Sequence, residues 1–269
     1  MRPGQVTAVH LARTTAAELS KLRTLPAVGL TAAATVVAGG TVAALAASSA
    51  VAGGASPTAA GVVTEVVRFV QAGMVLVGVL PVAHESAGTQ LRTTFAAVPR
   101  RAVLVAAKTL AALVALVFTA AGTVCAMVGG AVVGSAMAAT APAWGVPGET
   151  EPRWAGPGAV VVSGEDLGRL AGAAVFLVLV GVLAHAVALL LRELVPALVT
   201  TLGLVLIVSP LLGSLTEHAR WLPDRAAALL WAPADPVLGP ADGALVATAW
   251  VLVVGASGGI RLLSSDAAG

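Results

Sequence analysis

The sequence has 269 residues, of which 58% are hydrophobic and only 10% are charged, and its mean hydropathy is +0.97. Soluble domains typically contain about 45–50% apolar and about 25% charged residues, so this chain lacks the polar surface that would cover a water-soluble core. The same composition excludes disorder, and a single cysteine excludes a disulfide scaffold. With a formal net charge of +2, the chain also lacks the clustered basic face of a nucleic-acid-binding protein. The composition therefore predicts an all-α integral membrane protein.

Six apolar runs are long enough to cross a hydrocarbon core, which needs about 20 residues at about 1.5 Å of rise each. Charged residues separate these runs, which lie at about 27–50, 62–83, 102–131, 170–191, 194–215 and 242–260. The first run exceeds the apolar core of a signal peptide, so we expect it to be an uncleaved membrane anchor. The chain thus divides into an N-terminal cytoplasmic or interfacial segment, 1–26, and a six-helix transmembrane domain, 27–269.

Lysine and arginine gather in alternate connecting segments, which predicts the orientation in the membrane. Ten of the fifteen precede the first run, lie in or just after the second connection, lie in the fourth connection or follow the last run, so both termini are expected in the cytoplasm. Five of the ten are expected to anchor the helices at the inner headgroups: Lys21, Arg23, Arg100, Arg101 and Lys108. Tryptophan agrees, because Trp221 and Trp231 fall in a predicted outer loop, where an interfacial belt can form.

Two segments outside the spans are predicted to be amphipathic helices. Residues 5–24 mix apolar and basic positions, which indicates a helix on the membrane surface. In the loop before residue 102, Leu91, Phe95 and Val98 fall at i, i+4 and i+7 and form one apolar stripe. A short helix of this kind can rest on lipid or occupy a groove on a partner protein, and the spacing alone does not choose between them.

Local sequence signals predict further features. Ser163 followed by Asp166 is typical of a capping box that opens the fourth span. The apolar and proline-rich segment 216–240 favours short helices at the outer surface. Glycines four residues apart, in the pairs Gly130 with Gly134 and Gly255 with Gly259, are expected to allow close helix packing.

Candidate chemical sites are few. His185 lies deep in the fourth span, and intramembrane ionisable groups are candidates for function. The simpler interpretation is a neutral histidine that bonds across two helices. The four histidines and one cysteine show no metal-ligand spacing. No G-x-x-x-x-G-K-[ST] loop occurs, so ATP-driven work would need a separate polypeptide.

Two motifs resemble those of actinobacterial ABC-2 type transporter permeases. The first is the stretch V-A-H-E-S-A-G-T-Q-L-R-T-T-F-A-A-V-P-R-R at 82–101, followed by A-A-K at 106–108. It is similar to the first cytoplasmic loop of that family, in which an acidic residue precedes a Gly-Thr or Gly-Met pair, an R-T-T-L-like helix and V-P-R-R. The second is E-L-S-K-L-R-T at 18–24, which resembles the E-x-x-K-L-R-[ST] opening of the family.

The resemblance implies an ABC-2 (type V exporter-like) permease fold, with an N-terminal interfacial helix and a cytoplasmic coupling helix seated on a nucleotide-binding subunit. It places the ATPase-coupling residues at Glu85, Gly88, Leu91, Arg92, Phe95 and Val98. This chain would hold no cofactor and would not itself be an enzyme, because ATP and Mg would bind the partner ATPase. A second permease copy or a paralogue, and membrane lipid, are the other partners implied.

The implied function is therefore the permease subunit of an ATP-driven exporter in the cell membrane. Two other classes stay open. An ATPase-independent transporter or channel usually places several polar or charged groups at mid-membrane, where this sequence offers His185. A non-transporting membrane scaffold or immunity protein on the same fold would dock an ATPase as well, so the sequence does not separate it from an exporter.

Overall fold

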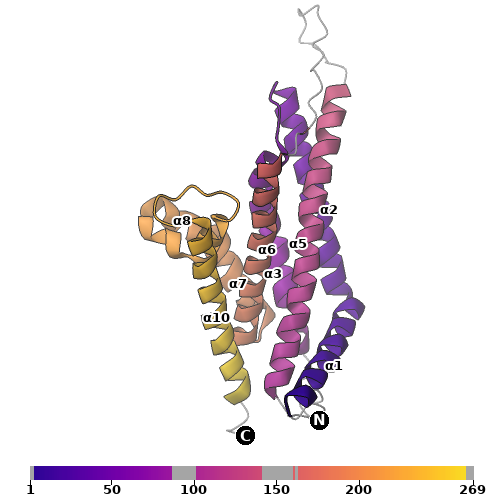
Figure 1. Cartoon of the computed structure of the whole chain (residues 1–269), viewed down its shortest axis with the longest axis vertical. Coiled ribbons are helices and arrows are strands. Elements are labelled where there is room, and N and C mark those ends of the chain that lie inside the picture. Colours follow the sequence, from indigo (N-terminus) through magenta and orange to yellow (C-terminus); the bar gives the residue numbers. More distant parts are fainter. Residues whose placement is uncertain (1–2, 87–100, 141–159, 161–162, 265–269) are drawn as a thin grey trace, which may run out of the picture.

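The computed structural model describes residues 3–86, 101–140, 160 and 163–264, and these residues form helices joined by turns and short connections, without a β-strand (Figure 1). A lipid environment offers no hydrogen bonds to the backbone, and helices satisfy nearly all of their own. The predicted helical class is therefore confirmed for the described residues.

Within the described ranges, six helices are long and apolar enough to cross a membrane, as the sequence predicts. The spanning elements are α2 (Pro26–Ala52), α3 (Ala59–Ser86), α5 (Arg101–Thr140), α6 (Gly164–Leu191), the continuous run α7 (Leu194–Leu202), η1 (Gly203–Val208) and α8 (Ser209–Leu215), and α10 (Pro240–Ser264). Within the fifth span, η1 is a π-helical segment. Such segments are rare and are frequent at functional sites.

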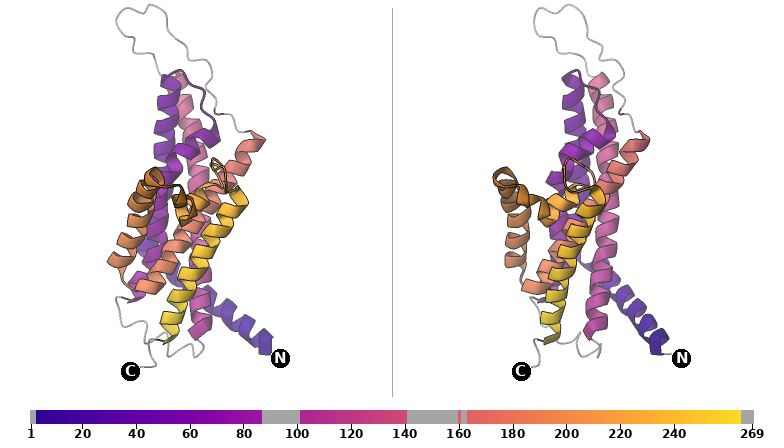
Figure 2. Two further views of the ribbon diagram at one scale, coloured as in Figure 1. Left: turned by 90° about the vertical axis from the view of Figure 1, so that its left-hand side faces the viewer. Right: turned by 60° about the vertical axis from the view of Figure 1, so that its left-hand side comes forward.

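The first residues of α1 (Pro3–Thr24) and the end of α10 lie at the same end of the bundle, which is called the termini end below (Figure 1). The predicted N-terminal helix is present as α1, and Figure 2 shows it diverging from the bundle axis. The chain bends between α1 and α2, where Leu25 is extended and Pro26 starts the next helix.

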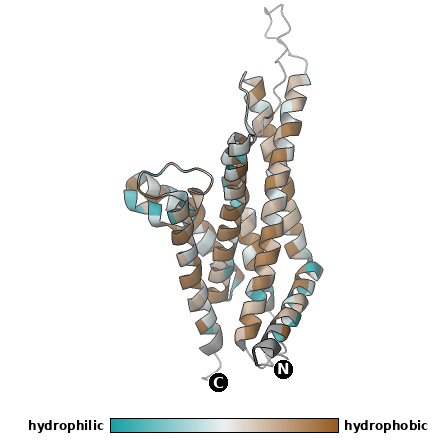
Figure 3. Ribbon diagram, viewed as in Figure 1, coloured by the Kyte–Doolittle hydropathy of each residue, from teal (hydrophilic) through white to brown (hydrophobic). Residues whose placement is uncertain are grey.

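Short helices and a helix cap lie in the half of the bundle away from the termini end (Figure 1). The predicted capping box is present, because Ser163 Oγ accepts from the Asp166 amide at 3.3 Å while Asp166 Oδ2 accepts from the Ser163 amide at 2.8 Å. The expected short helices of the last loop are η2 (Glu217–Trp221) and α9 (Pro223–Ala228). Figure 3 shows hydrophilic residues concentrated near α8 and on α1, with apolar residues along the spans between them.

The core is centred on α3 and α6, which are the most buried of the spans. Large side chains that are fully enclosed there include Phe176, Met74 and Leu177. By contrast, α10 and the α7–α8 run lie at the side of the bundle and expose much of their apolar surface. At 40 residues, α5 would measure about 60 Å, and together with α2 it extends beyond the other helices (Figure 1).

Close backbone contact joins α2 to α5. A Cβ atom added at Gly130 or Gly134 would collide with the carbonyl oxygen of Gly40 or Ala44, respectively. The predicted close packing at Gly130 and Gly134 is therefore confirmed. The second predicted pair is wrong: nothing lies within 4 Å of a Cβ at Gly259, and Gly255 meets only Ala186 at 3.8 Å. Gly258 makes the close contact instead, with Leu189 and Leu190 of α6.

The α2–α5 contact generates a first prediction, for which the chain contains a matched control. Replacing Gly130 with Val should separate the two helices and cost at least about 1–3 kcal/mol, because the obstacle is backbone and not a movable side chain. Gly129→Val should be tolerated, since nothing lies within 4 Å of a Cβ there. Thermal unfolding of the detergent-purified variants measures the difference, and equal melting temperatures for the two would contradict the packing argument.

Candidate functional site

Most of the predicted coupling residues lie outside the described part of the chain. Gly88, Leu91, Arg92, Phe95 and Val98 fall in the segment 87–100, as does the predicted anchor Arg100. Glu85 belongs to the last turn of α3, and Arg101 is the first residue of α5. The segment that carries the predicted coupling helix therefore connects α3 to α5 at the termini end.

A buried ion pair joins α1 to α5 at this end. Lys108 Nζ lies 3.3 Å from Glu18 Oε2, and the side chains of both residues are less than one-tenth exposed. Lys21 adds a second contact, with its Nζ 2.7 Å from Glu18 Oε1. Lys108 was expected at the inner headgroups. Its side chain is buried instead, because Glu18 of α1 lies beside α5 and supplies a carboxylate. Lys21 is about half exposed at the side chain, and Arg23 at the end of α1 is exposed.

The charge state of Glu18 follows from competition between burial and the two lysines. Burial by itself raises the pKa of a carboxyl group, but Lys108 and Lys21 outweigh it and lower the pKa of Glu18 below its usual 4.5. Glu18 is therefore ionised at neutral pH. Removing one member of a buried ion pair is costly, because it leaves a desolvated charge.

His185 bonds across two helices, as the simpler sequence interpretation holds. Its Nδ1 lies 3.2 Å from the carbonyl oxygen of Gly78 on α3, and the residue is fully buried. Because a carbonyl only accepts, Nδ1 carries the proton. The contact is possible because α3 and α6 touch one turn away: a Cβ at Gly78 would collide with the carbonyl oxygen of Gly181.

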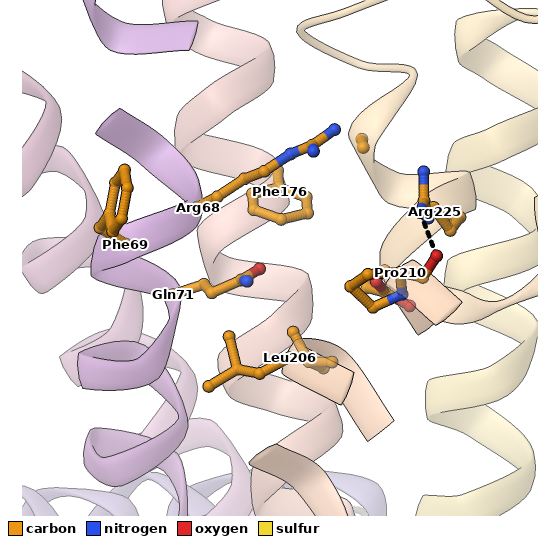
Figure 4. A pocket seen from close by; sticks show the side chains of 10 residues that line it. Arg68, Phe69, Gln71, Phe176, Leu206, Pro210 and Arg225 are labelled. Carbon is orange, nitrogen blue, oxygen red and sulfur yellow. Dashed lines mark hydrogen bonds between the residues drawn. The ribbon is translucent and has the colours of Figure 1, made fainter. Parts of the chain in front are cut away.

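A cavity of about 240 Å³ lies towards the end of the bundle opposite the termini. It is bounded by α3, α6, the fifth span and α9, and Figure 4 shows Arg68 and Gln71 projecting from α3 near Phe176, with Pro210 and Arg225 on the opposite side. Residues of the π-helical segment, Val205 and Leu206, form part of its wall. Sequence reasoning did not find this cavity.

The two arginines of the cavity are held by weak contacts. The Arg68 guanidinium lies 5.7 Å from the centroid of the Trp231 ring, and no ion pair joins it to Glu65, although the structure describes both residues. Arg225 Nη2 reaches the carbonyl oxygens of Ser209 and Pro210 at 3.4 and 3.5 Å. Trp231 packs edge-on against Phe176 and is 3% exposed, so its predicted place in an interfacial belt is wrong.

Asp224 is a buried carboxyl group in the wall of this cavity. It is 8% exposed, and its Oδ1 has no hydrogen-bond partner among the described residues. Burial raises the pKa of Asp224 above its usual value, although the proximity of Ser209 and Arg225 opposes the shift. The cavity thus combines two cationic side chains with a buried carboxyl group whose pKa is raised.

The described residues contain no group of three or more His, Cys, Asp or Glu side chains that could hold a metal ion. Comparison with protein-family models, with curated proteins and with solved structures gives no match for this chain. The functional argument therefore depends on the residues themselves.

The Glu18–Lys108 pair generates a second prediction. Glu18→Gln and Lys108→Met should each lower the free energy of unfolding by about 3–5 kcal/mol at neutral pH. The double variant should lose less than the sum, with a coupling energy of about 0.5–3 kcal/mol. Because the folded state lowers the pKa of Glu18, its contribution is complete above pH 4.5 and is lost as the pH falls through the lowered value.

Denaturant unfolding in detergent measures this cycle, and Lys21→Met is the control. Lys21 contacts the same carboxylate but is 48% exposed at the side chain, so its removal should cost no more than about 1 kcal/mol. Additive effects of the Glu18 and Lys108 substitutions would show that the pair does not hold α1 to α5.

His185 generates a third prediction. Gln at this position keeps an N–H that can reach the Gly78 carbonyl oxygen, whereas Leu leaves that oxygen without the donor. His185→Leu should therefore lower the free energy of unfolding by about 1–3 kcal/mol, and His185→Gln by clearly less. Thermal unfolding of the two variants tests this order. If Leu were tolerated as well as Gln, the histidine would not act as an interhelical donor.

Proposed function

We propose that this chain is the membrane-spanning permease subunit of an ATP-driven ABC exporter, with an ABC-2 type fold and a separate ATPase subunit docked at the termini end. The proposal assigns that end to the cytoplasm of a cell whose plasma membrane the six helices cross. Each copy would pair with a second copy or a paralogue to complete the substrate path.

The Glu18–Lys108 ion pair is the observation that carries the proposal. The two motifs that resemble the permease family are far apart in sequence, and a charged residue of each meets the other in this contact. Glu18 opens the motif at 18–24, and Lys108 closes the motif at 82–108. Lys108 lies in an apolar helix of the kind that ordinarily excludes a charge, and its pairing with Glu18 explains its presence there.

The same contact suggests how movement at the partner would reach the membrane. The proposed coupling helix lies in the connection between α3 and α5, so displacement of that connection acts on the first turns of α5. Lys108 pairs this part of α5 with Glu18 of α1, so α1 would move together with α5. Because α2 begins immediately after α1, the movement would reach α2 as well. Closure of two ATPase subunits would in this way reposition α2, α3 and α5 together.

The described residues favour an ATPase-dependent protein over a secondary transporter. Secondary transporters usually gather several polar or ionisable groups around a site at mid-membrane. Here the three buried ionisable residues of the described spans are already engaged: His185 with the Gly78 carbonyl, Lys108 with Glu18, and Asp166 with the Ser163 amide. None of the three lines the cavity near α9.

The proposal generates a fourth prediction, on the coupling helix. Phe95→Asp places a charge in the centre of the predicted apolar stripe, where an unpaired buried charge is costly. The variant should insert into the membrane normally but should lose co-purification with the ATPase, and with it ATP-dependent efflux. Thr94→Asp adds the same charge on another face of the helix and should keep the complex.

The measurement is affinity purification from membranes that co-express the chain with an ATPase encoded beside it, followed by efflux from the same cells. Equal recovery of the ATPase with Phe95→Asp and with Thr94→Asp would show that the helix rests on lipid. In that case, the coupling role proposed for residues 85–98 would be refuted.

A further inference from the structure

The cavity near α9 brings charged and polar side chains from separate elements to one place. Arg68 and Gln71 come from α3, and Asp224 and Arg225 come from α9. Asp224 is 8% exposed and interacts with the side chain of Ser209, and the Arg68 guanidinium lies over the Trp231 ring. A pocket lined by apolar groups together with a few convergent charged groups is a candidate binding site.

The chemistry of the cavity favours an anionic occupant. Arg68 and Arg225 both line it, and no carboxylate forms an ion pair with either one within the described part of the chain. Among the described residues, Arg225 donates hydrogen bonds to neutral carbonyl oxygens, at the long distances of 3.4 and 3.5 Å, and its charge also acts on Asp224. Two guanidinium groups offer many donors in a fork that matches phosphate or carboxylate oxygens. Asp224 also lines the cavity, and burial raises the pKa of its carboxyl group.

The surroundings of the cavity indicate that the occupant also has an apolar part. Phe69 and Leu206 line the cavity and are 72% and 45% exposed, so they form an apolar lip that faces outward from the bundle. The cavity itself, at about 240 Å³, is somewhat smaller than the pockets that enclose whole small ligands. It fits a head group whose remaining part lies outside, over this lip.

The depth of the cavity agrees with such a ligand. His84 lies near the termini end of α3, and Arg68 lies about 24 Å from it along the helix, at about 1.5 Å per residue. In a hydrocarbon core of about 30 Å that begins near His84, Arg68 is therefore close to the opposite boundary. Asp224 and Arg225 belong to α9, which follows the end of the fifth span. The cationic side chains therefore lie at the level where lipid head groups begin, with the apolar lip on the membrane side.

We propose that this cavity binds an anionic membrane amphiphile, with its phosphate or carboxylate between Arg68 and Arg225 and its acyl chain across Phe69 and Leu206. The site does not depend on the proposed exporter function, and its test needs no ATPase. Binding would supply acceptors to the two guanidinium groups.

The test is a thermal-shift and native mass-spectrometry titration of the purified full chain in detergent. Three probes are compared: dioctanoyl phosphatidylglycerol, dioctanoyl phosphatidylcholine and inorganic phosphate. The phosphatidylglycerol should stabilise the protein and remain bound, whereas phosphatidylcholine should bind at least about tenfold more weakly. Inorganic phosphate should give no stabilisation at the same concentrations, because it lacks the chain.

Variants then locate the binding. Arg68→Gln and Arg225→Gln should each weaken phosphatidylglycerol binding by about 10–100-fold, as expected for the loss of a charged hydrogen-bond donor. Arg169→Gln is the control, since Arg169 is an exposed arginine near the same end of α6 and does not line the cavity. Wild-type affinity in folded Arg68→Gln or Arg225→Gln protein would overturn the proposal.

The comparison of probes stands even if both variants fail to fold. Equal binding of phosphatidylglycerol and phosphatidylcholine by the wild-type chain would show that the guanidinium groups do not select the head group. Equal stabilisation by inorganic phosphate would show a free-anion site in which the acyl chain plays no part. Each of these results would refute an amphiphile site.

Discussion

Direct contact between helix backbones is the interaction on which this structure depends. Inside a membrane, burying an apolar side chain between helices gains little over leaving it in lipid, so helices associate through close packing and interhelical hydrogen bonds. Gly130 and Gly134 bring α5 against the carbonyl oxygens of α2, and Gly78 brings α3 against Gly181 of α6. The second of these contacts sets the distance at which His185 reaches across to Gly78. Glycines lack a side chain, so they let two helix backbones approach closely. This close approach makes a polar contact between the helices possible.

The sequence was sufficient to predict the spans because their cause is local. A run of about 20 apolar residues bounded by charges has few alternatives in a bilayer, and the capping box at Ser163 needs only neighbouring residues. Which glycine faces a partner is not local. A four-residue spacing identifies one face of a helix but not the direction of that face, so the prediction was correct for Gly130 and wrong for Gly259, where Gly258 makes the contact.

The candidate sites were harder to predict for the same reason. Lys108 resembles a headgroup anchor until α1 supplies Glu18, which lies 90 positions away in the sequence. Trp231 resembles an interfacial residue until the segment after α9 folds against α6, where a Cβ at Gly172 would collide with the carbonyl oxygen of Leu230. The cavity takes its key side chains from α3, α6 and α9. No motif spans such distances, and the available signal was the presence of Arg68 within an apolar run.

Charged side chains have different partners at the two ends of the molecule, and this difference bears on what each end can do. At the termini end, a carboxylate with a lowered pKa is held by two lysines, and a compact ion pair of this kind transmits displacement because separating it is costly. At the other end, Arg220 forms ion pairs with Glu217 and Asp235, whereas Arg68 lies over the Trp231 ring and Arg225 contacts neutral carbonyl oxygens. A group left in that condition gains free energy from a ligand that completes its hydrogen bonds. The residues of the termini end are thus suited to mechanical connection, and those of the opposite end to recognition of a ligand.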